Sequence, residues 1–313
     1  MDKLVKNNKL PLVLDLDQTL VHCVLQEHLD SGLVDGDISE TIQFSAKKAL
    51  YRVAFRPHLA KFIRNAKQLF EIHLYTSGTR EYAKTVLELI SHHLLDGEPV
   101  IQGKMVSRCD TGNANSKNLM FVVPGLENYC VILDDNVFVW ETWRSNVLQI
   151  FPFMHFKTVP KDDPKENQDQ SSGEENTIFE ETDTYLNSMY NVLRDIHCRF
   201  FKFEEINKRI PIEEHIQHRR KWVLSGTNLV FSGLFPVNVI PEQQRLWKNA
   251  QSFGANCSVT LTPHSTHLIA ARPGTRKVHK ALETDSIYVV NSLWLDLSIA
   301  HWVKRNELKF LLI

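Results

Sequence analysis

Residues 10–20 read LPLVLDLDQTL, an uncharged apolar run that ends in two carboxylates and a hydroxyl. Leu and Val runs of this length are typical of strands covered on both faces, as in a parallel α/β sheet. Ligands in such sheets bind beyond the carboxyl ends of the strands, where Asp15 and Asp17 lie. Side chains two residues apart in an extended segment point to the same side, so these carboxylates can face one pocket and share a cation. From this stretch alone, a strand-terminal turn with aspartates as local backbone acceptors is the open alternative.

A second apolar strand pattern, residues 129–133, also ends at paired carboxylates, Asp134 and Asp135. A solvated turn is the ordinary explanation for one such pair. Two apolar strands that both stop at acidic pairs are much less expected by chance, and together they predict a divalent-cation site.

Further polar residues that could line the same site lie later in the sequence. The strand pattern of residues 71–75 ends at Thr76 and Ser77, and the next helical pattern begins after Thr79, which can cap it. Lys117 lies in a polar loop and by itself would be an ordinary surface lysine.

Composition limits the class of protein. The 313 residues are 43% hydrophobic, enough for about two domains with cores, and we expect a soluble globular protein. The formal net charge of −1 gives no overall attraction to nucleic acid or to an anionic membrane. Five scattered cysteines without C-x-x-C spacing indicate a reducing compartment rather than a disulfide framework or a zinc site. No stretch approaches 18 uncharged apolar residues, so no membrane span is expected.

The fold class predicted is α/β, with a parallel-sheet domain, a small β insertion, a helical connecting region and a smaller C-terminal α/β domain. We place the first domain at residues 1–159 and its β insertion between residues 22 and 55. An acidic, polar linker follows at 160–181, and a helical connecting segment at 182–224. The pattern of strands and helices restarts in residues 225–313.

Four short motifs contain these polar residues. They are Asp15-Leu16-Asp17-Gln18-Thr19, Leu74-Tyr75-Thr76, Ser107-Arg108 with Lys117, and Asp134-Asp135 followed by Val139-Trp140. Together they resemble the aspartyl-phosphate phosphatases of the haloacid dehalogenase superfamily. More narrowly, they resemble the catalytic domain of the TFIIF-associating phosphatases that act on the C-terminal domain (CTD) of RNA polymerase II.

Four stretches of the C-terminal region form a second set of motifs: residues 231–236, 266–271, 274–278 and 289–295. Together they resemble a BRCT domain. A catalytic domain followed by a BRCT domain is the layout of the same phosphatase type.

The resemblance implies roles for the clustered residues. Asp15 would be the nucleophile and Asp17 the general acid and base. The Mg²⁺ ligands would be an Asp15 oxygen, the Asp17 carbonyl and Asp135, with Asp134 orienting this shell or holding Lys117. Lys117 and Thr76 would bind the phosphoryl group, Arg108 the substrate, and Thr19 would brace the loop.

The implied function is a Mg²⁺-dependent protein-serine phosphatase acting on the RNA polymerase II CTD in the nucleus. General transcription factors are implied as further partners; relatives dock them through an acidic tail, and this sequence ends at Ile313. A non-catalytic phosphopeptide-binding scaffold is the alternative from another class. A phospholipid phosphatase would keep the chemistry, but neither a membrane anchor nor the BRCT resemblance supports it.

Resemblance to phosphate-binding BRCT domains suggests a second, smaller phosphate pocket from Ser232, the Gly233 N–H and Lys277. A hydroxyl, an amide and an ammonium that converge on one dianion would form charge-assisted hydrogen bonds. The alternative is that Ser232 only shapes a turn and that Lys277 is a solvated helix residue.

Overall fold

The computed structural model describes residues 7–28, 42–46, 49–112, 115–156, 183–204, 210–236, 238–284 and 286–312. The chain divides into two compact units, Met1–Tyr190 and Asn191–Ile313. Helix α6 (Tyr185–Glu204) runs across the boundary between them. The predicted linker at 160–181 lies outside the described residues.

The first unit is built on a parallel five-stranded sheet in the order β6-β5-β1-β7-β8. Its strands are β1 (Leu10–Leu14), β5 (Phe70–Tyr75), β6 (Met105–Val106), β7 (Val131–Asp134) and β8 (Val147–Gln149). All five residues of β1 are buried, as expected for an apolar run in the centre of a sheet covered on both faces. The α/β architecture predicted from residues 10–20 is therefore present.

The helices of this unit connect the strands. They are α3 (Leu59–Leu69), α4 (Arg80–Leu94) and the short α5 (Arg108–Thr111). Single 3-10 turns lie at η1 (Gln26–His28), η2 (Leu119–Phe121), η3 (Glu127–Tyr129), η4 (Val137–Val139) and η5 (Arg144–Asn146). The Thr79 side chain accepts a 3.3 Å hydrogen bond from Tyr82 N and caps α4 as predicted.

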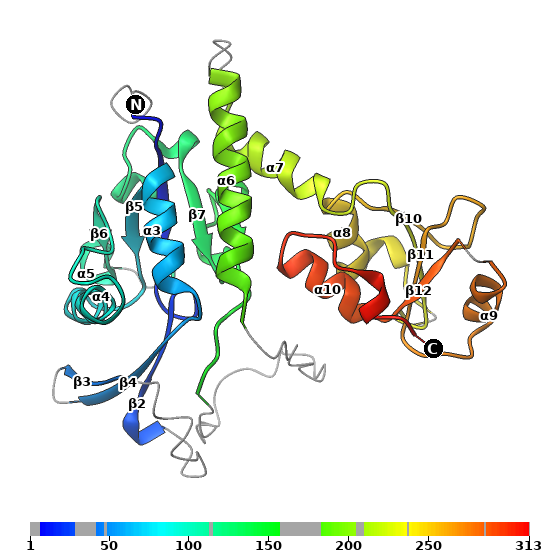
Figure 1. Ribbon diagram of the computed structural model, residues 1–313, viewed down its shortest axis with the longest axis horizontal. Helices are drawn as coiled ribbons and strands as arrows, with labels where there is room; N and C mark the ends of the chain where they lie inside the picture. Colours follow the sequence, from blue (N-terminus) through cyan, green and yellow to red (C-terminus); the bar gives the residue numbers. More distant parts are fainter. Residues whose placement is uncertain are drawn as a thin grey trace. The chain divides into compact units, whose positions relative to one another are not determined.

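The predicted β insertion is an antiparallel sheet in the order β2-β4-β3. It consists of β2 (Val21–Leu25), β3 (Ile42–Ala46) and β4 (Ala49–Phe55). In Figure 1 these strands project below the five-stranded sheet. Because β2 begins directly after the loop that follows β1, the insertion stands beside the acidic end of the central strand.

The second unit contains a parallel four-stranded sheet in the order β10-β9-β11-β12. Its strands are β9 (Asn228–Ser232), β10 (Asn256–Ser258), β11 (His267–Ala270) and β12 (Tyr288–Val290). Its helices are α7 (Ile212–Trp222), α8 (Arg245–Ser252), α9 (Arg276–Leu282) and α10 (Ser292–Ala300), with turns η6 (Pro241–Gln243) and η7 (Glu307–Lys309). Helices α8 and α10 lie on one side of this sheet and α9 on the other (Figure 1).

Two elements of the second unit differ from the sequence-based expectation. The pattern predicts a single helix over residues 241–253, but Gln244 has extended backbone angles and separates η6 from α8. It also predicts a strand at 258–261, whereas β10 occupies Asn256–Ser258. Within the described residues, no helix has both the length and the apolar character that a membrane crossing requires.

Candidate active site

Three carboxylates meet at the carboxyl edge of the five-stranded sheet. Strands β1 and β7 are neighbours, with Leu14 opposite Leu133, and Asp15 N donates a 3.0 Å hydrogen bond to Leu133 O. This pairing brings Asp15, directly after β1, next to Asp134, the last residue of β7. One carboxylate oxygen each of Asp15, Asp134 and Asp135 can be chosen so that all three lie within 4.8 Å of one another.

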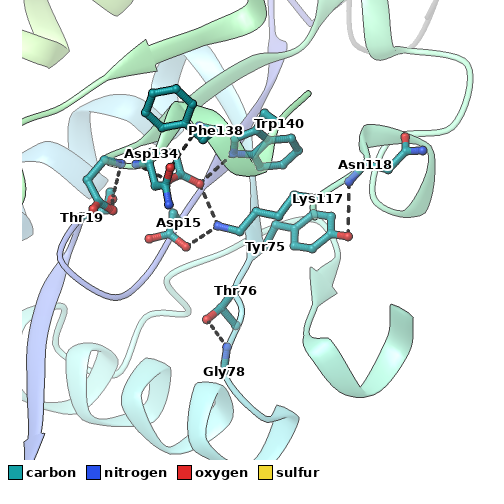
Figure 2. A network of polar contacts seen from close by, with 12 residues as sticks. Asp15, Thr19, Tyr75, Thr76, Gly78, Lys117, Asn118, Asp134, Phe138 and Trp140 are labelled. Atoms are coloured by element: carbon teal, nitrogen blue, oxygen red, sulfur yellow. Dashed lines mark hydrogen bonds and ion pairs between the residues drawn. The ribbon is translucent and has the colours of Figure 1, made fainter. Parts of the chain in front are cut away.

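The Lys117 ammonium lies between two of these carboxylates (Figure 2). It donates to Asp15 Oδ1 at 2.6 Å and to Asp134 Oδ2 at 2.7 Å. The lysine is buried, and its ammonium lies 5.9 Å from the Tyr75 ring centre and 5.5 Å from that of Trp140. Burial lowers the pKa of Lys117, but the charges of Asp15 and Asp134 oppose it and the net pKa is raised. The two carboxylates therefore favour the charged form of Lys117, although its loop position in the sequence suggested an ordinary surface residue.

Asp134 is the most completely bonded of the three carboxylates. Besides Lys117, its Oδ2 accepts from Trp140 Nε1 at 2.7 Å, and its Oδ1 accepts from Asn136 N at 2.8 Å. Trp140 is fully buried. Trp140 lies six positions after Asp134 and belongs to one of the sequence motifs. Its hydrogen bond to Asp134 depends on the conformation of the intervening loop, so the sequence alone does not predict it.

Asp135 and Thr19 form a reciprocal pair. The Thr19 hydroxyl donates to Asp135 Oδ1 at 3.2 Å and accepts from Asp135 N at 3.1 Å. Burial, followed by the nearby Asp134 charge, raises the pKa of Asp135 to about 6. Thr19 thus ties the loop after β1 to the loop after β7.

The Asp17 carboxylate is not one of the three clustered carboxylates, and it bonds instead to a residue of α4. It accepts a hydrogen bond from the Tyr82 hydroxyl and another from Thr76. The Thr76 oxygen in turn accepts from Gly78 N at 2.9 Å. Burial raises the pKa of Asp17, with these two hydrogen bonds opposing the shift. In the sequence, Tyr82 is one apolar position of the helical pattern after Thr79. That pattern does not predict its hydrogen bond to Asp17.

The Asp15 carboxyl also has a pKa well above its usual value. Burial is the main cause, and the Asp134 charge adds to it, while Lys117 acts in the opposite direction. A carboxyl destabilised as an anion in this way favours any additional cation that binds beside it.

A cavity of about 250 Å³ adjoins Asp17. Its lining residues come from the β insertion, the start of α4 and the start of α5: Asp17, Cys23, Tyr51, Gly78, Thr79, Glu81, Tyr82 and Arg108. Arg108 is exposed at the N-terminal end of α5 and shares this cavity with Asp17. The arrangement leaves room for a substrate side chain to approach Asp17 past a guanidinium.

The donor set at the sheet edge fits a magnesium ion. Mg²⁺ prefers carboxylate and carbonyl oxygens and needs only a few protein ligands because it keeps several waters. Three carboxylates within reach of each other and one neutralising lysine leave an excess of negative charge for a cation to compensate. Among the described residues, the Asp17 carboxylate is not part of this cluster, so the Asp17 backbone carbonyl stays the predicted ligand.

The residues suggested for a second phosphate pocket have other partners. Ser232 Oγ lies 2.8 Å from Thr275 Oγ1. The Lys277 ammonium donates to Phe231 O at 2.8 Å and to Val259 O at 2.7 Å, and burial lowers its pKa. Lys277 is thus bound to backbone carbonyls rather than solvated.

A cavity of about 170 Å³ lies beside this lysine. Gly233, whose φ is 72°, and Lys277 line it together with mainly apolar and aromatic residues, among them Phe235 and Trp247. Ser232 does not line it. The phosphate-pocket hypothesis remains a prediction.

Comparison with known families gives two matches. The NLI interacting factor-like phosphatase family matches residues 10–170, which contain the whole aspartate and lysine cluster. The twin BRCT domain family matches residues 239–294 in the second unit.

Three relatives carry similar names. The Arabidopsis thaliana RNA polymerase II C-terminal domain phosphatase-like 4 is 30% identical over 98% of this chain and 71% of its own length. An RNA polymerase II C-terminal domain phosphatase of Schizosaccharomyces pombe is 26% identical, with 99% of this chain and 58% of the relative covered. The corresponding phosphatase of Caenorhabditis elegans is 28% identical, with 98% and 46% covered. The chain therefore spans between about half and three quarters of the length of these relatives.

Two solved structures match the entire chain. The structure of Fcp1, an essential RNA polymerase II CTD phosphatase, has a TM-score of 0.71 at 28% identity and is covered over 98% of its length. A variant of fission yeast Fcp1 bound to beryllium fluoride has a TM-score of 0.70 at 25% identity, again with 98% of that chain covered. The chain therefore belongs to the NLI interacting factor-like phosphatases, a family of protein phosphatases, and carries a BRCT-like C-terminal region.

Proposed function

We propose that this chain is a Mg²⁺-dependent protein-serine phosphatase that acts through a phosphorylated Asp15, with the phosphorylated CTD of RNA polymerase II as its substrate and the nucleus as its location. The observation that carries the proposal is the buried Lys117 ammonium between Asp15 and Asp134, with Asp135 alongside. A cation surrounded by carboxylates at a sheet edge is suited to receive a phosphoryl group together with a metal ion.

In the first step, an Asp15 oxygen attacks phosphorus, and the bond from phosphorus to the serine oxygen breaks. Asp17 gives its proton to that leaving oxygen. Its raised pKa, caused mainly by burial, favours the protonated form that this step needs. Tyr82 and Thr76 hold the Asp17 carboxyl at the wall of the cavity through which the serine would enter.

In the second step, a water attacks the phosphorus of the phosphorylated Asp15, and Asp17 accepts a proton from that water. The bond between phosphorus and the Asp15 oxygen breaks, so that phosphate leaves and the carboxylate is restored. The same group acts first as acid and then as base, and its hydrogen bonds with Tyr82 and Thr76 would keep it in place for both steps.

The other residues stabilise charge. Lys117 would pass from its present bond with Asp15 to a phosphoryl oxygen, while Asp134 keeps the ammonium in place. Mg²⁺, held by Asp15, the Asp17 carbonyl and Asp135, would neutralise the phosphoryl oxygens. Thr19 would keep Asp135 in position, Thr76 would offer its hydroxyl, and Arg108 would bind the substrate in the cavity beside Asp17.

The substrate assignment is supported by the relatives, several of which are named as RNA polymerase II CTD phosphatases. It is also supported by coverage of nearly the whole Fcp1 structure, including the C-terminal region. Contacts with general transcription factors stay a prediction of the resemblance.

The test is release of phosphate from CTD heptad peptides that carry one phosphoserine each, with Mg²⁺ and with EDTA. We expect Mg²⁺-dependent turnover in the wild type and none in Asp15→Asn, because an amide cannot attack phosphorus although it is nearly isosteric. Asp15→Asn with a tenth of the wild-type rate would remove Asp15 as nucleophile. Peptide binding without any hydrolysis would instead support the scaffold alternative.

Fluoroberyllate provides an independent readout. With Mg²⁺ it should inhibit tightly by adding to the Asp15 carboxylate and mimicking the phosphorylated residue, and a relative has been solved with beryllium fluoride. A crystal structure with the fluoroberyllate bound away from Asp15 would contradict the mechanism.

A further inference from the structure

Arg56 is a buried arginine that none of the sequence motifs includes. It follows β4 directly and is 1% exposed. Its guanidinium donates to Phe151 O at 2.6 Å, to Thr19 O at 3.1 Å and to Gln18 O at 3.4 Å. Its Nε donates to Asp183 Oδ2 at 2.9 Å. One side chain therefore joins the loop after β1, the segment after β8 and the residues that precede α6.

The loop that Arg56 holds carries two of the active-site aspartates, Asp15 and Asp17. Gln18 has a left-handed φ of 62°, a conformation that a non-glycine residue keeps only when its surroundings impose it. The Gln18 carbonyl also accepts from Phe153 N at 2.7 Å, and the neighbouring Thr19 binds Asp135. The guanidinium thus binds the carbonyls of Gln18 and Thr19, the two residues that follow Asp17.

Asp183 is the charged partner of this guanidinium. Its side chain is 18% exposed, and its second oxygen accepts from Tyr185 N at 3.0 Å at the start of α6. The Tyr185 and Phe153 rings lie 5.4 Å and 5.7 Å from the guanidinium carbon, so the cation is enclosed by aromatic groups as well. Carbonyl dipoles alone compensate a buried charge poorly, which makes the Asp183 carboxylate the group that keeps Arg56 in this position.

We propose that Arg56 is a positioning residue of the active site and that Asp183, two residues before α6, holds Arg56 in place, so that the segment before α6 helps to position the active-site loop. The inference rests on the proposed phosphatase function. Residues far from Asp15 in the sequence would then control the rate of the chemical step without touching substrate or metal.

The test is the variant Asp183→Asn. The asparagine oxygen can still accept from Tyr185 N, but the charge is lost and an amide NH₂ then faces Arg56 Nε. We expect kcat on a phosphoserine peptide to fall by about tenfold to a hundredfold with KM unchanged, because a misplaced aspartate affects the transition state more than binding. Asp183→Glu, which keeps the charge, should recover most of the loss.

Hydrogen exchange gives a readout apart from activity. In the loop, Gln18 N donates to Val21 O, and the Leu20 and Val21 amides both donate to Leu16 O. In Asp183→Asn these three amides should exchange faster by about tenfold, because the loop opens more readily once Arg56 is displaced.

The matched control is Asp96→Asn. Asp96 forms a 2.7 Å ion pair with Arg64 in the same unit, but its side chain is 91% exposed. Exposed pairs contribute little, so this variant should leave kcat and loop exchange at wild-type values.

Wild-type kcat and unchanged loop exchange in Asp183→Asn would overturn the inference, as would an Asp183→Glu variant that is as impaired as Asp183→Asn. If the wild type hydrolyses no phosphoserine peptide, the proposed function fails separately. The exchange measurement still decides whether Asp183 holds the loop in that case.

Discussion

The Lys117 ammonium lies 2.6 Å from Oδ1 of Asp15, so the proposed nucleophile is held by the cation that we expect to receive the phosphoryl group. Asp134 binds the same ammonium at 2.7 Å, and Lys117 therefore keeps an anionic partner when Asp15 is phosphorylated. This shared contact gives Lys117 a role in stability as well as in chemistry.

Lys117→Met should destabilise the metal-free protein by about 3–5 kcal/mol, because it leaves buried carboxylates without a counter-charge. Mg²⁺ should restore part of this loss by compensating the same carboxylates. Urea unfolding with and without Mg²⁺ measures both effects. Lys67→Met is the control, since its partner Glu98 is 65% exposed and the pair should contribute less than about 1 kcal/mol. An equal effect of Mg²⁺ on both variants would contradict this role for Lys117.

Asp17→Asn should reduce turnover of a phosphoserine peptide by about 10²–10⁴-fold, since the serine oxygen needs a proton to leave. Nitrophenyl phosphate, whose leaving group needs none, should lose far less in its first step. Glu81→Gln removes another carboxyl from the same cavity and should not reproduce this difference between the two substrates, because Glu81 donates no proton in the proposed mechanism. Equal losses of Asp17→Asn on the two substrates would exclude the general-acid role.

Asp135→Asn and Asp134→Asn should separate metal binding from stability. Asp135 is half-buried and its side chain bonds mainly to Thr19, so its replacement should raise the Mg²⁺ concentration needed for activity by about 10–100-fold with little loss of stability. Asp134 also binds Lys117 and Trp140, so its replacement should cost about 1–3 kcal/mol of stability in addition. Magnesium titrations of activity and urea unfolding measure the two effects. Unchanged titrations in both variants would place the metal elsewhere.

The contribution of His22 and His73 to the free energy of unfolding should fall as the pH decreases from about 6.5 to about 4, whereas the carboxyls of raised pKa at the active site contribute in the opposite direction. Burial lowers the pKa of His22 and of His73 to about 4, whereas the unfolded chain binds these protons near pH 6.5. Between these pH values the two histidines bind protons in the unfolded state but not in the folded state, so acidification favours unfolding. Below about pH 4 both states are protonated at these histidines, and their contribution to stability no longer changes. His73→Asn can keep the acceptor for Lys104 N without titrating, and should lose less stability between these pH values than the wild type.

The control for this pH effect is His92→Asn, which changes an exposed histidine in the same unit. Its stability should depend on pH as the wild type does. A His73→Asn profile that matches the wild type would show that His73 titrates normally in the folded protein.

Gly103→Ala should destabilise the first unit by about 1–3 kcal/mol through overpacking. A Cβ at this position would lie 2.2 Å from two atoms of the His73 ring, which would have to move and lose its hydrogen bond from Lys104 N. The double variant with His73→Ala should be less destabilised than the sum of the two single variants, because the smaller side chain makes room. Additive losses in urea unfolding would indicate that the His73 ring is not the obstacle.

The sequence alone determined the parallel α/β architecture, the β insertion and the second α/β region, because the decisive signals are local. Residues 10–14 and 131–133 are apolar runs of strand length, and each is followed at once by acidic residues. The carboxyl ends of parallel strands share an edge, so the proximity of Asp15 and Asp134 follows from strand pairing. The resemblance to known phosphatases added the family and the prediction that Lys117 binds the phosphoryl group.

Only the tertiary structure decided which groups hold these residues in place. Tyr82 donates to Asp17 across 65 positions of sequence, and Arg56 bonds to Asp183 across 127. Lys277, which the resemblance suggested for phosphate binding, donates to two backbone carbonyls from distant parts of the second unit. Such partners depend on how loops distant in sequence pack together. No periodicity or local spacing encodes that packing, since a buried polar group is satisfied by whichever donor or acceptor the folded chain brings within reach.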